Sequence, residues 1–459
     1  MYAFTLISSL MGGSAAFQLP ALGGSSIPPV QFALGFLVLR LLLPGSGAGE
    51  LVKEGICANG LLVGFAVYGV TMAFVGPRIF ADQIMVVPMR PTAGYMFAVF
   101  KLGPTSQNVT ASVYMLGTMM LAVASYAACR HEEGASALVK AGVAICCLHM
   151  FFGISGVVFA GTAWSEVLGF FRNGNYAQLD QRLGTVVRMN GIHPEPSSFA
   201  GFGFVWFLFM AECWYRGVQP RVTGWVALTM GLTLAASTSS TAYLGLAAYL
   251  TVFLLRAVFV PDGVSSAKLI RLAIVALALA IVVSLTFLLK PDLVATASRV
   301  FTSMTVGKQG SDSALQRAFW AHQGVNAFWA SSGLGIGPGS FRSSSLPAAV
   351  IGATGLSGAA LLSLYVIQVL KPWRASTYNR VQNMADATGV AAAWTAACML
   401  IPASVVSPTA DPGGDFAIFA GAALALRRSA RHSSSLTPAF RPASPAAHLT
   451  SPWPKPRAS

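Results

Sequence analysis

The chain has 459 residues, of which 55% are hydrophobic and only 10% are charged, and its formal net charge is +14 at pH 7. A water-soluble protein of this length does not bury so large an apolar fraction, so the composition excludes the soluble globular class. The positive charge is spread over short segments and a C-terminal tail, which argues against a nucleic-acid-binding protein.

Apolar segments that suit membrane crossing recur along most of the chain. A transmembrane helix needs roughly 20 apolar residues to cross about 30 Å of hydrocarbon. We therefore predict an all-α, polytopic integral membrane protein with about 12 transmembrane helices and large periplasmic loops. The first crossing lacks the basic start of a signal peptide, so we expect it to be an uncleaved helix. The predicted crossings lie near residues 2–18, 28–45, 57–76, 110–128, 138–160, 197–214, 223–239, 241–260, 269–289, 346–370, 387–406 and 414–427.

Lysine and arginine residues in the short loops predict the orientation. If both termini are cytoplasmic, all of these basic loops fall on the cytoplasmic side, as the positive-inside rule requires. The residues concerned are Lys53, Arg130, Arg216, Arg221, Lys268, Arg271, Lys371, Arg374 and Arg380. The long segments 77–109, 161–196 and 290–345 then fall on the periplasmic side, and loops of such length usually carry function.

The chain divides into a membrane domain, residues 1–427, and a basic tail, residues 428–459, that is rich in proline and serine. We expect the tail to be disordered and cytoplasmic. The six cysteines show no CxxC spacing and are typical of small hydrophobic residues in helices. His, Cys and Asp residues show no metal-ligand spacing, so we expect no bound metal and no other cofactor.

Residues 188–204, RMNGIHPEPSSFAGFGF, place an arginine, a histidine and a carboxylate directly before an apolar run. Pro196 suits the first turn of a helix, which puts Glu195 at or near the N-cap. The helix dipole favours a carboxylate there by roughly 0.3–1 kcal/mol, so Glu195 should stay ionised. Glu195 is then either a catalytic group or a cap that pairs with Arg188 and braces the loop. His193 is a reserve candidate, because a lone loop histidine is more often structural.

This stretch resembles a motif of the bacterial O-antigen ligase/polymerase (Wzy/WaaL-like) superfamily, particularly its exopolysaccharide polymerases. The matching residues are Arg188, Gly191, Glu195, Pro196 and Ser197. A second match lies in SALQRAFWAHQGVNAFWASSGLGIGPGSFRSSSLPAAVIGATGLSG, at Arg317, Gly333, Gly335, Gly337, Gly339, Ser340, Arg342, Gly355 and Leu356. The segments LPALGGSSIPPVQFALGFLVLRLLL and STSSTAYLGL also look like parts of the family, so the resemblance covers roughly residues 1–425.

The resemblance implies a glycosyltransferase of the bacterial inner membrane with a periplasmic active site. It would polymerise undecaprenyl-diphosphate-linked oligosaccharide repeats during exopolysaccharide or O-antigen biosynthesis. The implied partners are these lipid-linked oligosaccharides, the lipid bilayer, a flippase and a chain-length regulator, and no nucleic acid.

The resemblance also implies residue roles. Arg188 and Arg317 would clamp the diphosphate, because planar guanidinium forks neutralise phosphate oxygens without a metal. Glu195 would accept the proton of the acceptor hydroxyl or orient an arginine, and His193 would be the reserve base. The substrate-binding residues would be Arg182, Ser197, Gly337, Gly339, Ser340 and Arg342.

One alternative within the same family, an O-antigen-type ligase, stays open. An O-antigen-type ligase of the family carries a histidine near the start of the helix after the glycine-rich segment, where this chain has serines at 343–345. That departure favours the polymerase.

The segment GLGIGPG lacks the preceding strand and the acidic residue of a dinucleotide site. Its glycines are expected to let the backbone approach a glycan or another helix.

A transporter or flippase of lipid-linked saccharides is an alternative from a different class. Transporters commonly consist of repeated halves, but the long segments 161–196 and 290–345 have unlike sequences. Few ionisable residues fall within the apolar runs. Arg40, Lys140 and Arg256 lie near helix ends, where we expect them to snorkel to the membrane surface.

Overall fold

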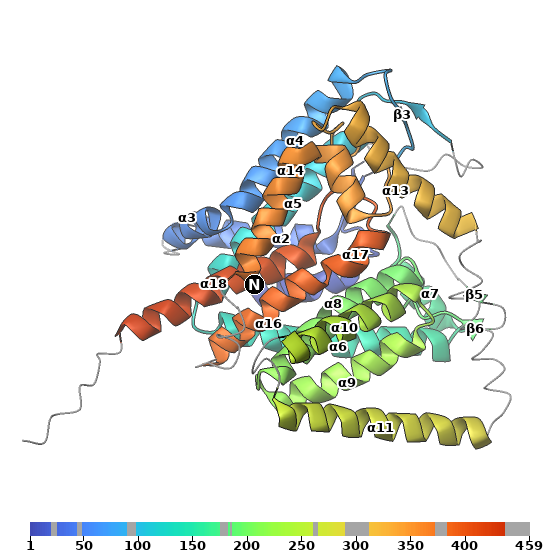
Figure 1. The fold of residues 1–459 in the computed structure, drawn as a ribbon, viewed down its shortest axis with the longest axis vertical. Coiled ribbons are helices and arrows are strands. Elements are labelled where there is room, and N and C mark those ends of the chain that lie inside the picture. The colour runs from blue at the N-terminus through green and yellow to red at the C-terminus, as the bar shows by residue number, and fades with distance from the viewer. Residues whose placement is uncertain are drawn as a thin grey trace, which may run out of the picture.

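The computed structural model describes residues 1–19, 25–43, 48–89, 98–174, 182–183, 186–259, 265–289, 312–371 and 383–436. Within these residues the fold is helical, and the strands form only three short antiparallel pairs, β1–β2, β3–β4 and β5–β6 (Figure 1). The elements in chain order are α1 (Tyr2–Ser8), η1 (Ser9–Met11), β1 (Phe17–Leu19), β2 (Ser25–Ile27), α2 (Pro29–Leu42), α3 (Gly49–Ala58), α4 (Gly60–Ile79), β3 (Met85–Val86), β4 (Phe100–Lys101), α5 (Ser106–Cys129), α6 (Gly134–Val158), α7 (Ala163–Phe170), β5 (Arg182–Leu183), β6 (Val186–Val187), α8 (Pro196–Tyr215), α9 (Pro220–Ala236), α10 (Ser240–Phe259), α11 (Ser266–Leu289), α13 (Asp312–Ala330), α14 (Leu346–Leu370), α16 (Met384–Cys398), α17 (Leu400–Val406) and α18 (Gly414–Leu436).

Eight spans in the described part of the chain are long and apolar enough to cross a membrane. They correspond to α4, α5, α6, α8, α10, α11, α14 and the consecutive helices α16 and α17. Helices satisfy every backbone hydrogen bond within the segment, which the bilayer interior demands. The prediction of a multi-pass, all-α membrane protein is therefore confirmed at this level.

The other four predicted crossings correspond to helices that are shorter or carry more charge than these eight spans. The first is the short run Tyr2–Met11, the second is α2 with 14 residues, and the third is α9 with 17 residues. Helix α18 carries the charged run from Arg427 onward in its second half and continues to Leu436, past the predicted domain boundary at 427. A total of twelve crossings stays a prediction, and residues 437–459 of the predicted tail lie outside the described residues.

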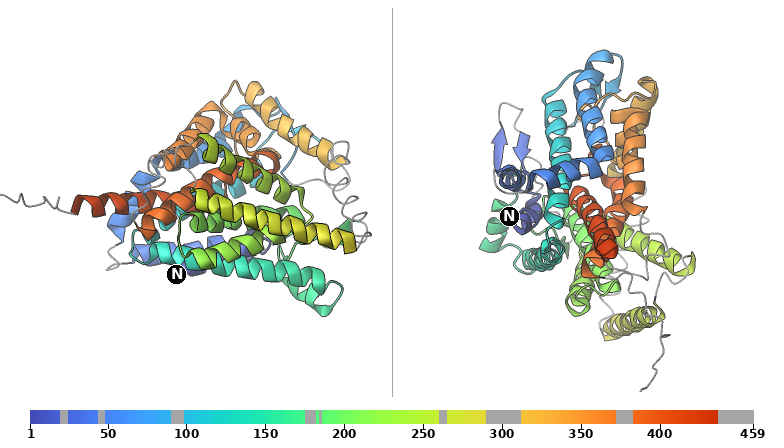
Figure 2. Two further views of the ribbon diagram at one scale, coloured as in Figure 1. Left: turned by 60° about the horizontal axis from the view of Figure 1, so that its bottom comes forward. Right: turned by 90° about the vertical axis from the view of Figure 1, so that its left-hand side faces the viewer.

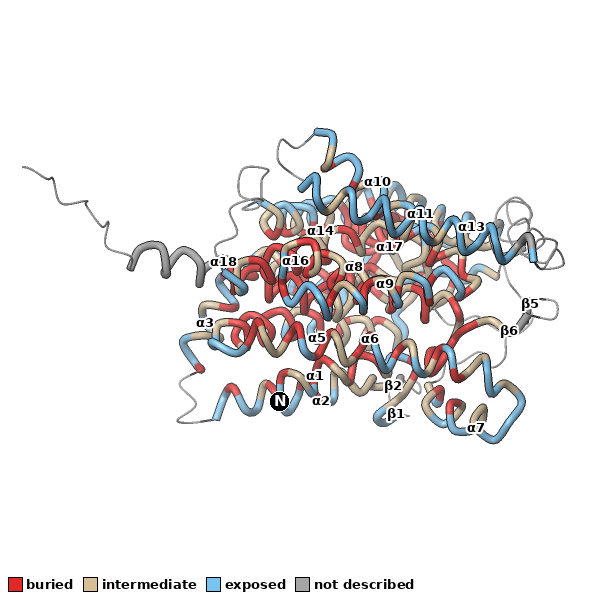
Figure 3. The backbone as a smooth tube through the Cα atoms, turned by 90° about the horizontal axis from the view of Figure 1, so that it is seen from below, coloured by how far each residue is buried: buried red, intermediate tan, exposed pale blue. Residues whose placement is uncertain are grey.

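The core of the bundle lies around α16 and the first half of α18. Helix α18 packs against α5 on one side and α16 on the other, and α16 also contacts α8. The α18 residues Phe416 to Leu426 are almost fully buried. Figure 2 shows α18 running between the group of α4, α5 and α14 and the group of α6, α8, α9 and α10. Figure 3 shows the same central burial, with exposed residues on the outer helices α2 and α11.

Several long connections meet on one surface, next to the N-terminal ends of α8 and α14. We call this surface the loop face; it comprises residues 12–19, 80–89, 159–174, 186–195 and 331–345. The Arg342 amide donates to the Val87 carbonyl over 2.9 Å, and the Gly174 amide donates to the Gly13 carbonyl over 3.1 Å. The described parts of the three predicted long segments therefore gather on one face.

The prediction that Arg256 snorkels to the membrane surface is wrong. Arg256 is only 5% exposed, and its Nη2 lies 2.7 Å from Oε1 of Glu212, which is itself fully buried. The buried Glu212 carboxylate on the neighbouring helix α8 is a stronger hydrogen-bond partner for the Arg256 guanidinium than water at the membrane surface is. Arg40 and Lys140, by contrast, are exposed.

Candidate functional site

The start of α8 holds Glu195 at the N-cap, as the sequence predicts. Glu195 has an extended backbone (φ −152°, ψ 160°), and Pro196 occupies the first helical position. The carboxylate makes no capping hydrogen bond to the backbone of α8. Its Oε1 instead accepts a hydrogen bond of 2.5 Å from the Ser197 hydroxyl. Since the backbone does not use this carboxylate, it is available for other groups on the loop face.

Arg188 is half-buried beside Glu195. Its Nη2 donates to the carbonyl oxygen of Thr238 over 3.2 Å. Burial lowers the pKa of Arg188, while the negative charge of Glu195 opposes that shift by stabilising the guanidinium. An arginine remains protonated in any case, so Arg188 is a fixed cation beside the Glu195 carboxylate. The structure thus brings Arg188, Glu195 and Ser197 together.

The turn between α9 and α10 supplies polar groups that the sequence reasoning did not assign to the site. Thr238 has a left-handed backbone with φ +52°. The hydroxyls of Thr238 and Ser239 are buried and make no hydrogen bond to any described residue. Tyr243, one turn into α10, is close enough to Arg188 to interact with it electrostatically. The signal was present in STSSTAYLGL, a run of small polar residues between two apolar helices. Buried polar groups normally have a partner, so these hydroxyls suit a polar ligand or water.

His193 lies in an aromatic cluster and not at an open surface. It is 3% exposed, and its ring centroid lies 5.2 Å from that of His149 on α6 and 5.1 Å from that of Phe202. Burial lowers the pKa of His193 to about 3, and the positive charge of Arg172 adds to the shift. The imidazole is neutral at pH 7 and is a weak base there, because an effective general base has a pKa near the working pH.

A second cluster forms around Arg342. Its guanidinium carbon lies 4.4 Å from the ring centroid of Trp320 on α13, and its Nη1 lies 3.4 Å from the Met89 carbonyl oxygen. Arg317 is on the same helix as Trp320, and its carbonyl accepts a 2.6 Å hydrogen bond from the Ser344 hydroxyl. Arg342 thus contacts α13 and residues 87–89, Arg317 accepts from Ser344, and Arg188 donates to Thr238 in the turn before α10. Helix α17 packs against both α10 and α14, the helices that begin next to these two groups.

The glycine-rich segment packs against helix backbones. Gly337 has φ +93°, and a Cβ there would come within 2.3 Å of the Met72 carbonyl of α4. Gly339 has φ +83°, and a Cβ there would come within 2.3 Å of the Gln107 carbonyl of α5. Ser340 is also engaged, because its hydroxyl accepts from Asn108 and donates to the Ile336 carbonyl. Of the two expected roles, approach to another helix therefore accounts for these glycines.

Arg182, the remaining predicted binding residue, lies in β5, which pairs with β6 on the loop face. In Figure 1 the two strands lie at the right-hand side, next to α7. Arg188 follows β6 directly in the chain, so β5 and β6 lead into the segment before α8.

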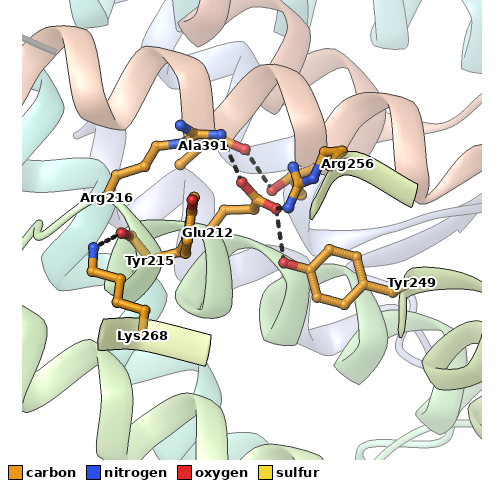
Figure 4. A network of polar contacts seen from close by, with 8 residues as sticks. Glu212, Tyr215, Arg216, Tyr249, Arg256, Lys268 and Ala391 are labelled. Carbon is orange, nitrogen blue, oxygen red and sulfur yellow. Dashed lines mark hydrogen bonds and ion pairs between the residues drawn. The ribbon is translucent and has the colours of Figure 1, made fainter. Parts of the chain in front are cut away.

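A third polar cluster lies at the other end of α8, and the sequence reasoning did not predict it. Glu212 accepts from Arg256 over 2.7 Å, from Arg216 over 2.9 Å and from the Tyr249 hydroxyl over 2.7 Å. Figure 4 shows the carboxylate between the two guanidinium groups, with Lys268 of α11 nearby. This cluster fixes α10 against α8. Among the described residues no group of three or more His, Cys, Asp or Glu side chains could hold a metal ion.

Comparisons with known proteins add no further assignment. No protein-family model, no curated protein and no solved structure matches the chain. The resemblance to the O-antigen ligase/polymerase superfamily thus stays a prediction, carried by the residues quoted for it.

Proposed function

We propose that the chain is a membrane glycosyltransferase that polymerises undecaprenyl-diphosphate-linked oligosaccharide repeats at the periplasmic face of the bacterial inner membrane. The observation that carries the proposal is the electrostatic interaction of Arg188 with Glu195 at the start of α8, on the loop face. The buried hydroxyls of Thr238 and Ser239 nearby make no hydrogen bond to any described residue. A guanidinium suits a diphosphate, and a carboxylate suits the proton of an attacking hydroxyl. The motif resemblance supplies the substrate class.

The proposed reaction needs no nucleotide. The acceptor hydroxyl oxygen attacks the anomeric carbon of the donor sugar and gives its proton to the Glu195 carboxylate. The bond from that carbon to the diphosphate oxygen breaks, and the lipid diphosphate leaves with the electron pair. Arg188 would stabilise the leaving charge through a two-pronged contact. Thr238 and Ser239 would donate hydrogen bonds from their hydroxyls to sugar or phosphate oxygens.

The environment of each candidate base supports Glu195 over His193. The carboxylate is half-buried and makes one short hydrogen bond, whereas the imidazole is enclosed by rings and has a pKa of about 3. In this proposal His193 is a packing residue of the loop before α8. Arg317 and Arg342 would bind the second lipid-linked repeat, because they lie in a separate cluster on the same face.

The proposal includes an orientation with the loop face in the periplasm. The Tyr2 hydroxyl lies 2.8 Å from the Ser125 hydroxyl, in the last turns of α5, so the chain begins at the end of the bundle opposite the loop face. Helix α18 runs toward that same end. Both termini would be cytoplasmic, and the basic loops that contain Arg130, Arg216 and Lys371 would share their side.

Deletion of the gene tests the proposal. A polymerase mutant should accumulate single oligosaccharide repeats on the lipid carrier, detected by mass spectrometry of extracted lipids, and should regain polymer when the wild-type chain is restored. Accumulation of full-length polymer still on its carrier would instead indicate a ligase. Single repeats confined to the cytoplasmic leaflet would indicate a flippase, and either result would overturn the proposal.

A further inference from the structure

An apolar groove of about 710 Å³ runs between α8, α9, α10 and α11, away from the loop face. Its size is in the range of small-molecule sites, roughly 300–1,000 Å³. The walls include Phe207, Leu228, Leu250 and Ile274. Helix α11 forms the outer wall, and none of its membrane-spanning part is buried inside the protein. The groove therefore lies at the periphery of the bundle, where membrane lipid is the surrounding medium.

The charged side chains of the groove are all basic. Arg221, in the first turn of α9, and Arg271, in the first turns of α11, line it, and both side chains are exposed. The described lining residues include no aspartate or glutamate. Two further cations, Arg216 and Lys268, lie near Arg271. Lys268 is close enough to both arginines for their positive charges to act on its ammonium group. Among the described residues near these cations, the Glu212 carboxylate is already paired with Arg216 and Arg256. The groove therefore carries an excess of positive charge at Arg221 and Arg271, which suits an anionic ligand.

The position of the charge defines one end of the groove. Its lining residues come from the second half of α8 (207–215), the middle of α10 (246–253), and residues 220–232 of α9 and 271–279 of α11. From Arg221 to Leu232 the helix rises about 17 Å at 1.5 Å per residue. This is close to half of the roughly 30 Å hydrocarbon core, so the groove spans one leaflet. Trp214 and Trp225 line the charged end, and tryptophan is enriched at the level of lipid headgroups.

We infer that this groove binds an anionic phospholipid of the leaflet opposite the loop face. The acyl chains lie along the apolar walls, and the phosphate lies between Arg221 and Arg271. A one-leaflet length suits a lipid better than a transmembrane helix of a partner, which would need the whole thickness. The lipid would hold α11 against α8, α9 and α10. The inference rests on the groove and its charges and does not depend on the proposed enzymatic function.

Native mass spectrometry of the full-length chain in neutral detergent tests the inference. The delipidated protein is titrated with phosphatidylglycerol or with phosphatidylcholine of identical acyl chains. We expect phosphatidylglycerol to bind with a dissociation constant about tenfold lower. Arg221→Gln and Arg271→Gln should each weaken its binding by about fivefold, the usual contribution of one basic residue near an anionic lipid. Ala211→Phe, which fills the groove without changing charge, should weaken it as well.

Arg40→Gln is the matched control. Arg40 is an exposed arginine in the last turn of α2, outside the groove, so its loss removes the same charge and should leave lipid binding unchanged. Equal binding of the two lipids would overturn the inference, as would equal effects of Arg271→Gln and Arg40→Gln. Binding of undecaprenyl phosphate in preference to phosphatidylglycerol would also overturn it. Because Arg271 is exposed, its variant keeps the test valid if Ala211→Phe does not fold.

Discussion

Arg188 and Thr238 are joined by a 3.2 Å hydrogen bond although 50 residues separate them in the sequence. The bond ties the segment before α8 to the turn before α10, so the guanidinium sits where two helices begin. Glu195 lies on the same side, with Ser197 donating to it. A cation, an anion and two buried hydroxyls therefore share one small region of the loop face.

Arg188→Lys tests whether the planar fork matters or only the charge. We expect the variant to lose at least about tenfold in polymer synthesis, because an ammonium cannot make the two parallel contacts of a guanidinium. The measurement is polymer yield from membranes with matched amounts of protein. Arg78→Lys is the control, since Arg78 is an exposed arginine at the end of α4 that bonds the Phe74 carbonyl of its own helix. Full activity of Arg188→Lys would remove the diphosphate contact from the proposal.

Glu195→Gln separates proton transfer from bracing of the loop. The amide keeps the shape but is no base, so turnover should fall by roughly 10²–10⁴-fold while the protein accumulates normally. Ser197→Ala removes the neighbouring hydroxyl alone and should have a smaller effect. A poorly accumulating Glu195→Gln protein with an early thermal transition would instead assign the carboxylate a structural role.

Acid should destabilise the protein through His193. Above pH 6.5, its ordinary pKa, the imidazole is neutral in the folded and the unfolded chain. As the pH falls from 6.5 toward about 3, the unfolded chain binds a proton that the buried ring does not, so the free energy of unfolding decreases. His193→Gln should reduce the fall of the thermal midpoint between pH 7 and pH 5. The exposed residue His131 is the control, and an unchanged slope in His193→Gln would contradict the buried environment.

Glu212→Gln should be strongly destabilising. It leaves Arg216 and Arg256 buried without their carboxylate, and breaking such a buried pair costs about 3–5 kcal/mol. Thermal unfolding in detergent should show a transition several degrees lower. Asp82→Asn breaks the exposed ion pair with Lys101 and should shift the midpoint little. Similar midpoints for the two variants would mean that water reaches the Glu212 cluster.

Gly339→Ala tests the packing of the glycine-rich segment. The added Cβ meets the Gln107 carbonyl at 2.3 Å, whereas at Gly161, with a similar φ of +82°, it meets no atom within 4 Å. Both variants carry the left-handed strain of about 1–2 kcal/mol. Only Gly339→Ala should also lose folded protein in the membrane. Equal abundance of both variants would show that the segment can move away from α5.

Local signals account for the part of the site that could be predicted. The proline after Glu195 fixed the start of α8, and the short spacing to Arg188 kept the two charges close. The glycines of residues 333–339 indicated a close backbone approach. Which surface they would approach depends on α4 and α5, more than 200 residues earlier in the chain.

The sequence alone determined that this protein is a multi-pass helical membrane protein and where most of its long helices lie, because apolar length and helix-start residues act locally. Only the tertiary structure decided which helices meet. It joined Thr238 to Arg188, enclosed His193 among rings, and paired Arg256 with Glu212, 44 residues away. These helices are apolar on nearly all sides, so their sequences do not mark the face that each presents to a neighbour. Polar contacts between them follow from the packing and appear only when the bundle is assembled.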